Sequence, residues 1–198
     1  MFERRSALTA QLAADGRDGV DGRRALRVSE VRGLYLAQLA VFRGREALLR
    51  DALQPLGADL AAEVGSRSAD ARCRIFHVAR GQFWIVTPDS TWLSQLALAV
   101  PPHAGAATLL SHGRVRIAVE GLEVRALLAK GIAIDLHPDK FRIGDFALTG
   151  LHHTGIFVER TGADRFELVV LRTFAASIWD WLLDAALPLG YELDVEGR

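Results

Sequence analysis

The sequence predicts an α+β fold of two ferredoxin-like pseudo-repeats, whose antiparallel sheets carry their helices on one face. Segments with strand and helix periodicity follow in the order strand, helix, strand, strand, helix, strand over residues 34–112. Nearly the same order returns over 114–190. Short turns join most strands, which favours antiparallel pairing. We therefore expect a single domain over residues 25–198, preceded by a flexible arm over residues 1–24.

The first pseudo-repeat is predicted from its periodicity and its turn residues. A helix is expected over 45–54, because its leucines recur at helical spacing and Pro55 ends the pattern. A second helix is expected to start at Pro88-Asp89 and to end at Pro101. A strand is expected at 34–41 from its alternation, and two at 72–78 and 82–86 from their β-branched and aromatic residues. A further strand is expected at 107–110.

The second pseudo-repeat has one additional strand. A helix is expected over 121–130, with Gly131 at its C′ position. The last helix is expected over 173–187, where the hydroxyl of Thr173 can cap its first turn. The strands of this repeat are expected at 115–119, 146–151, 155–160 and 166–172.

The last helix is apolar around most of its circumference. Ser177, Asp180 and Asp184 form one narrow polar stripe, which leaves an apolar arc of roughly 240°. One core of a 198-residue chain cannot cover such an arc, so the helix is expected to lie between the core and a partner chain. In the alternative, the sheet or the N-terminal arm folds over the second apolar face. That second face, the predicted partner interface, consists of Trp179, Leu183, Ala176 and Ala186.

Composition excludes several classes of function. Lys+Arg and Asp+Glu are equal at 24 each, so no overall field attracts nucleic acid or an anionic membrane. No run approaches the ~20 apolar residues of a membrane span, and the first residues lack a secretory signal. Cys73 is the only cysteine, which excludes a disulfide framework. Its neighbours, Arg-Cys-Arg-Ile-Phe, indicate that it is a small residue of a strand. We expect a reduced cytoplasmic protein.

The residues that could perform chemistry do not form a recognisable site. The acids of the N-terminal segment recur every three residues, unlike the alternate spacing of a calcium loop. His152 and His153, if they lie on a strand, point to opposite faces and cannot bind one ion together. The Gly-x-Ser-x-Gly motif of hydrolases is absent. We therefore predict no catalytic, cofactor-binding or metal-binding residue, and assign turns to the remaining cluster of Asp135, His137, Asp139 and Asp145.

Three blocks of sequence resemble a known family. They are Leu127–Gly144, Ala147–Thr149 and Leu171–Ala175, and Trp179 and Trp181 follow the last block. Their order and spacing, over roughly residues 107–190, resemble the gamma subunit of heterotetrameric sarcosine oxidase. The family usually has Arg-Ser-Phe-Ala where this chain has Thr at the second position.

The resemblance implies a fold and a function beyond what the residues show. Gamma subunits of this family look like the folate-binding domain of aminomethyltransferases. In the family's complex, alpha, beta and delta subunits accompany the gamma chain, and FAD, FMN, NAD and zinc belong to those other chains. The complex oxidises sarcosine to glycine, with oxygen as electron acceptor and tetrahydrofolate as acceptor of the carbon. The resemblance thus implies a non-catalytic subunit that docks on the large alpha subunit.

Two other functions remain open. The chain could be the gamma subunit of a sister oxidase or dehydrogenase that acts on another N-methylated amine, since this subunit is not expected to touch substrate. It could also be a free-standing folate-binding protein similar to aminomethyltransferases. Such enzymes normally carry a further domain, and this chain ends shortly after the second pseudo-repeat, so the subunit is the favoured interpretation.

Overall fold

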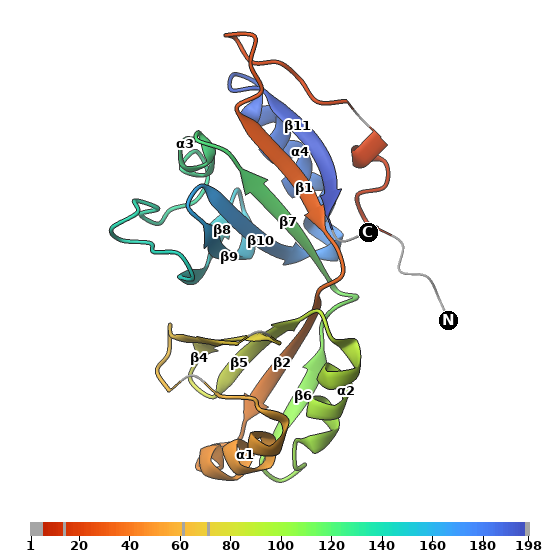
Figure 1. The fold of residues 1–198 in the computed structure, drawn as a ribbon, viewed down its shortest axis with the longest axis vertical. Helices are drawn as coiled ribbons and strands as arrows, with labels where there is room; N and C mark the ends of the chain where they lie inside the picture. Colours follow the sequence, from red (N-terminus) through yellow and green to blue (C-terminus); the bar gives the residue numbers. More distant parts are fainter. Residues whose placement is uncertain (1–5, 14, 61, 71, 197–198) are drawn as a thin grey trace. The chain divides into compact units, whose positions relative to one another are not determined.

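The structure, a computed structural model, describes residues 6–13, 15–60, 62–70 and 72–196 (Figure 1). The predicted α+β fold with two mainly antiparallel sheets is confirmed. The chain divides into two compact units, of which unit 2 spans Gly33–Ser111 and unit 1 contains the segments before and after it. Unit 2 nearly coincides with the first predicted pseudo-repeat. Parts of the predicted arm and domain lie outside the described residues, namely 1–5, 14, 61, 71, 197 and 198.

Unit 2 has the ferredoxin-like topology that the sequence predicts. Its sheet order is β3-β4-β5-β2-β6, and every pair of neighbours is antiparallel. Without the short edge strand β3, this is a split βαβ arrangement in which β5 lies between β4 and β2. The elements are β2 (Tyr35–Val41), α1 (Glu46–Leu53), η2 (Gln54–Leu56), β3 (Arg67–Ala69), β4 (Arg74–Ala79), β5 (Gln82–Thr87), α2 (Ser90–Ala99) and β6 (Gly105–Leu109).

The helices of unit 2 cover one face of its sheet. The carboxylate of Asp89 accepts a hydrogen bond of 2.8 Å from the backbone N–H of Trp92, so α2 begins where the sequence predicts. Alternation along the strands sends every second side chain to this face. The core between helices and sheet includes Ala37, Leu39, Leu49, Leu53, Ile75, Phe83, Ile85, Trp92, Leu93 and Leu96.

Unit 1 combines the second pseudo-repeat with the start of the chain. Its sheet order is β11-β1-β7-β10-β9-β8. One face packs against α3 and α4. The elements are η1 (Gln11–Ala13), β1 (Leu26–Val31), β7 (Arg114–Glu120), α3 (Val124–Leu128), β8 (Phe146–Leu151), β9 (Thr154–Gly162), β10 (Arg165–Leu171), η3 (Arg172–Phe174), α4 (Ala175–Ala186) and β11 (Tyr191–Glu196).

Two strands of unit 1 were not predicted from the sequence. β1 lies between β11 and β7, and Figure 1 shows β1 and β11 side by side. Without β1, the order β11-β7-β10-β9 is that of a ferredoxin-like repeat, with β8 added at the edge. β1 pairs with β11 in parallel, which among the described strands is the one departure from the predicted antiparallel arrangement.

The N-terminal segment packs on unit 1 where it is described. Leu8 is fully buried in the core, and Leu12 packs against that core from outside. The backbones of Arg17 and Tyr191 exchange two hydrogen bonds of 2.7 and 2.8 Å. These contacts differ from the flexible arm that the polar composition predicts, because a few apolar side chains suffice to attach the segment to an apolar surface.

The ends of two helices also differ from prediction. Gly131 does not have the positive φ of a C′ glycine; instead, a Cβ there would lie 2.6 Å from the ring of Trp181, so the residue permits a close approach. Thr173 belongs to η3, and α4 starts after Phe174 without a side-chain cap. In the part of the chain that the structure describes, none of the helices has the length and hydropathy to cross a lipid bilayer.

Candidate functional site

The structure places two of the four predicted interface residues inside the protein. Trp179 and Ala186 have no exposed surface and belong to the core of unit 1. A side chain without exposed surface cannot contact a partner. These two are therefore core residues, not the exposed anchors that the sequence predicts. Ala176 and Leu183 remain partly exposed.

The division of the apolar arc of α4 into a core face and a partner face, as predicted from the sequence, is wrong. The face that packs on the sheet is centred near Trp179, since the buried residues of α4 are Ala175, Ile178, Trp179, Leu182 and Ala186. The arc is covered from several directions: the sheet lies beneath it, and α3 and η1 contact α4 beside it. Coverage by the N-terminal segment, the alternative to a partner chain, is thus present in the structure.

One flank of α4 remains available for a contact with another chain. Ala176, Leu183 and Leu187 follow one another at helical spacing along a single stripe, which we call the α4 flank. Leu187 is 39 % exposed. Asp180 lies on the same stripe and is exposed, so the flank is apolar with one acidic group.

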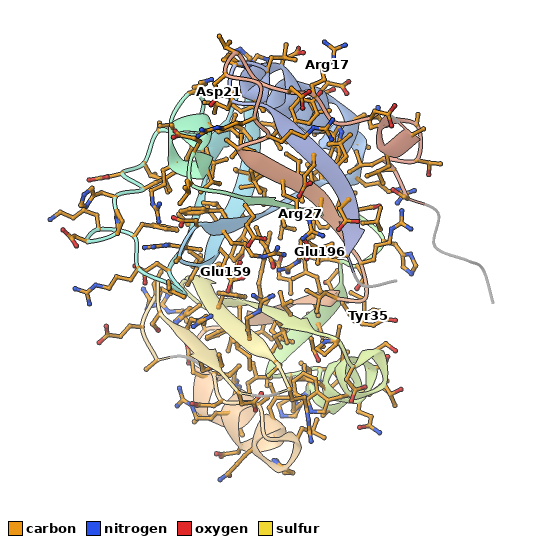
Figure 2. The ribbon with its side chains drawn as sticks, turned by 45° about the horizontal axis from the view of Figure 1, so that its top comes forward. Arg17, Asp21, Arg27, Tyr35, Glu159 and Glu196 are labelled. Carbon is orange, nitrogen blue, oxygen red and sulfur yellow. The ribbon has the colours of Figure 1, made fainter. Side chains whose placement is uncertain are left out.

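A second surface is the face of the unit 1 sheet opposite the helices. Alternation explains it: Leu26 and Val28 of β1 point into the core, so Arg27 and Ser29 point to the other face. Figure 2 labels Arg27, Glu159 and Glu196 among these side chains. We call this set the charged sheet face; its members are Arg27, Ser29, Arg116, Glu120, Glu159, Arg165, Glu167, Asp194 and Glu196.

Ion pairs across the charged sheet face attach the last strand to the rest of the sheet. Arg27 donates to Asp194 of β11, and the Ser29 hydroxyl donates to Glu196 at 2.5 Å. Arg165 of β10 donates to Glu196 at 2.6 and 3.0 Å. These contacts add side-chain bonds to the parallel pairing of β1 with β11.

A second cluster on this face is buried. Arg116 donates to Glu167 at 2.5 Å, and Glu159 lies 4.0 Å from the same guanidinium nitrogen. All three side chains are buried. Buried carboxylates require such a partner, because an unpaired charge in the interior is strongly unfavourable. The arrangement is therefore typical of structural support.

Glu196 of this face is a poor general base at neutral pH. The hydrogen bond from Arg165 lowers the pKa of Glu196 below its ordinary value, and the Ser29 hydroxyl acts in the same direction. The same hydrogen bond raises the pKa of Arg165. Both groups are held in their charged forms, which favours a structural or recognition role for the pair.

The lowered pKa of Glu196 predicts a dependence of stability on pH. A carboxyl whose folded pKa is below its unfolded pKa of about 4.3 stabilises the fold above that pH. This contribution is lost as the pH falls through the folded pKa. The variant Glu196→Gln should show a smaller loss of stability between pH 5 and pH 3, in urea unfolding at several pH values. Parallel pH profiles of the two proteins would contradict this assignment.

The residues considered for chemistry serve the turns that contain them. The carboxylate of Asp135 accepts from the backbone N–H of His137 at 2.9 Å, and that of Asp145 accepts from the N–H of Arg142 at 2.6 Å. No group of three or more His, Cys, Asp and Glu side chains is placed to hold a metal ion among the residues that the structure describes.

His152 and His153 lie in the turn between β8 and β9, not on a strand. Their ring centroids are 4.7 Å apart, so they do not point to opposite faces as the sequence argument assumed. His152 has a positive φ of 49°, the left-handed conformation of a tight turn. Its ring also stacks near Trp181, at 6.4 Å. The opposite-face argument therefore does not apply to this pair, because the strand ends at Leu151, where the sequence predicted its end.

Cys73 is a core residue of unit 2. It is buried, and burial together with the nearby carboxylate of Asp70 raises the pKa of its thiol to about 12. The thiol is therefore protonated at neutral pH, whereas the thiolate is the reactive form. The sequence predicted a small strand residue; Cys73 is buried, but it lies directly before β4 and not within it.

Comparison with known proteins points to one family. Residues 93–187 match the sarcosine oxidase, gamma subunit family. A chain of the heterotetrameric sarcosine oxidase from Corynebacterium sp. U-96, solved in complex with pyrrole 2-carboxylate, is similar in structure. Its TM-score is 0.80 at 26% sequence identity, over 92% of this chain and 94% of that chain. No sequence among curated proteins matches.

A second similar structure is the glycine cleavage system aminomethyltransferase T from Bartonella henselae. The TM-score is 0.61 at 16% identity, over 88% of this chain and 48% of that chain. This likeness shows the fold alone, and the chain corresponds to about half of that protein's length. The predicted resemblance to the sarcosine oxidase gamma subunit and to an aminomethyltransferase fold is confirmed.

Proposed function

We propose that this chain is the non-catalytic gamma subunit of a flavin-dependent, tetrahydrofolate-linked sarcosine oxidase. One observation carries the proposal: the likeness to a chain of the Corynebacterium enzyme extends over nearly the whole length of both chains. The match of residues 93–187 to the gamma subunit family supports it independently. Within the matched range lie α3, α4 and the strands β7 to β10.

In this proposal the chain contributes structure and contacts, and other subunits contribute the chemistry. The partners are alpha, beta and delta subunits in the cytoplasm, and those subunits hold FAD, FMN, NAD and zinc. The complex converts sarcosine to glycine with oxygen as acceptor. The lowered pKa of Glu196 supports the assignment, since a carboxylate of lowered pKa is a weak general base.

The isolated chain should be colourless and inert toward sarcosine. The measurements are the visible absorbance spectrum of the purified chain and its oxygen uptake with sarcosine. Coexpression with its proposed partner chains provides the control, because the assembled complex should be yellow and should consume oxygen. A stoichiometric flavin on the isolated chain would refute the non-catalytic assignment.

The same preparation separates the alternative functions. A panel of N-methylated amines given to the assembled complex distinguishes a sarcosine oxidase from a sister oxidase or dehydrogenase. Titration of the isolated chain with tetrahydrofolate tests the free-standing folate-binding protein. Tight folate binding without any partner chain would favour that alternative and would count against the gamma subunit.

We further propose that the α4 flank contacts the large alpha subunit. Large apolar side chains that stay exposed beside a polar rim are typical interface anchors. Leu187→Glu should weaken assembly by about 2 kcal/mol, the scale of an interface hot spot. The measurement is the affinity of the chain for the alpha subunit by titration calorimetry.

The matched control for this variant is Leu122→Glu. Leu122 is 83 % exposed, lies in unit 1 and is not part of the α4 flank. Both variants should unfold at nearly the same temperature as the natural chain, because neither side chain is buried. Equal affinities for Leu187→Glu and Leu122→Glu would remove α4 from the interface.

A further inference from the structure

Unit 2 contains a cavity of about 180 Å³ that the proposed function does not use. It lies between α1, the segment that follows α1, and the hairpin of β4 and β5. Val41, Leu60 and Phe83 form apolar walls. A cavity of about 150 Å³ with apolar walls holds a benzene ring, so this one admits a compact organic molecule.

A buried histidine points into this cavity without a hydrogen-bond partner. His77 is 9 % exposed and lines the cavity, and its ring stacks on Phe83 at a centroid distance of 4.2 Å. Neither ring nitrogen has a partner among the described residues. An imidazole always carries at least one donor, and a buried donor without a partner is unfavourable. The ring N–H therefore lacks a hydrogen-bond acceptor, and a bound ligand can supply one.

The backbone of His77 shows that its position is fixed by the fold. Its N–H donates to the carbonyl of Ser66 at 3.0 Å, and its carbonyl accepts from Gly65 at 2.8 Å. The strand and the stacked ring thus hold the imidazole toward the cavity. Only the side-chain nitrogens are left to be satisfied.

The charged residues that line the cavity favour an anion. They are two arginines, Arg50 and Arg80, and one glutamate, Glu46. No side-chain hydrogen bond or ion pair joins any of the three to a described residue. Glu46 and Arg50 lie one helical turn apart on α1 and can neutralise each other. Arg80, in the turn between β4 and β5, then remains as the uncompensated cation.

We propose that this cavity binds a small carboxylate with a compact apolar body. The carboxylate accepts hydrogen bonds from the guanidinium of Arg80 and from the ring N–H of His77. The body of the ligand lies against Leu60 and Phe83. A planar guanidinium matches the two oxygens of a carboxylate, which an ammonium or a neutral donor does not do as well.

Benzoate is a suitable probe, and benzamide is its neutral counterpart. The full chain, labelled with ¹⁵N, is titrated with each compound while the imidazole signals of His77 are followed by NMR. Benzoate should shift these signals in a saturable manner. Benzamide should bind at least roughly tenfold more weakly, since the loss of a charge-assisted bond costs that much affinity. Benzoate that leaves the His77 signals unchanged would overturn the proposal.

Three variants test the assigned contacts. Arg80→Gln should weaken benzoate binding roughly tenfold, and His77→Phe, which retains an aromatic ring of similar size, should abolish it. The control is Arg43→Gln, an exposed arginine outside the cavity, which should bind as the natural chain does. Arg80 is exposed, so its variant is expected to fold and decides the test even if His77→Phe does not fold. Equal benzoate affinity in Arg80→Gln and Arg43→Gln would refute the site.

Discussion

Replacing Trp179 with alanine is expected to lower the free energy of unfolding by about 3–5 kcal/mol. Trp179 has no exposed surface and lies in one apolar cluster with Leu8 and with the strands of unit 1. Removal of the indole leaves a cavity whose walls belong to a sheet, a helix and the N-terminal segment, and a sheet held by ladder hydrogen bonds cannot collapse to fill it. Urea unfolding followed by circular dichroism measures the loss.

Two further variants, one at Trp179 and one at the residue that precedes α4, make the measurement specific. Trp179→Phe should lose much less stability, because the ring fills most of the space and because the indole nitrogen has no hydrogen-bond partner among the described residues. Phe174→Ala should lose less than about 1 kcal/mol, since Phe174 is 45 % exposed. If Trp179→Ala lost no more stability than Phe174→Ala, Trp179 would not be a main packing contact between α4 and the core.

The second large effect is expected for Arg116→Met. This change leaves the carboxylates of Glu167 and Glu159 buried without the cation that lies 2.5 and 4.0 Å from them. Loss of one partner from a buried ion pair typically costs about 3–5 kcal/mol. We expect the lower end of this range, because Arg165 still lies 3.4 Å from Glu167. The double variant Arg116→Met with Glu167→Leu should recover part of the loss, since it also removes one of the stranded charges.

A surface ion pair is the control for Arg116→Met. Arg24 and Asp18 are joined at 2.8 Å, but both side chains are exposed. Arg24→Gln should therefore change the free energy of unfolding far less than Arg116→Met does. The readout is again urea unfolding, for all variants at the same pH and ionic strength. An Arg116→Met protein as stable as Arg24→Gln would show that Arg116 does not support the buried carboxylates.

Elements with strong local signals could be predicted from the sequence. β2, β5 and β8 lie within one or two residues of prediction, and α2 starts at the predicted Asp89. These elements have clear alternation or a helix cap, so a window of a few residues contains the information. The resemblance to the gamma subunit also rested on local blocks, and it is confirmed by the match over residues 93–187.

The candidate site was harder to predict, because exposure depends on what packs against a residue. Trp179 is buried in a cluster that also contains Leu8, about 170 residues earlier in the chain, and no local sequence pattern indicates that they share a core. His77 carried no signal in its sequence neighbourhood, since its unpaired ring is visible only after α1 and the β4–β5 hairpin enclose a cavity. A histidine on the core face of a strand is the feature that could have drawn attention to it.

The sequence by itself determined the class of the fold, the succession of most helices and strands, and the family that the chain resembles. Periodicity, helix caps and turn residues are local signals, so a short stretch of sequence is enough to recognise each of them. The tertiary structure alone decided the insertion of β1 beside β11 and the coverage of α4. β1 and β11 pair residues such as Leu26 and Tyr191, and pairing energy between segments so distant leaves no trace in either segment alone.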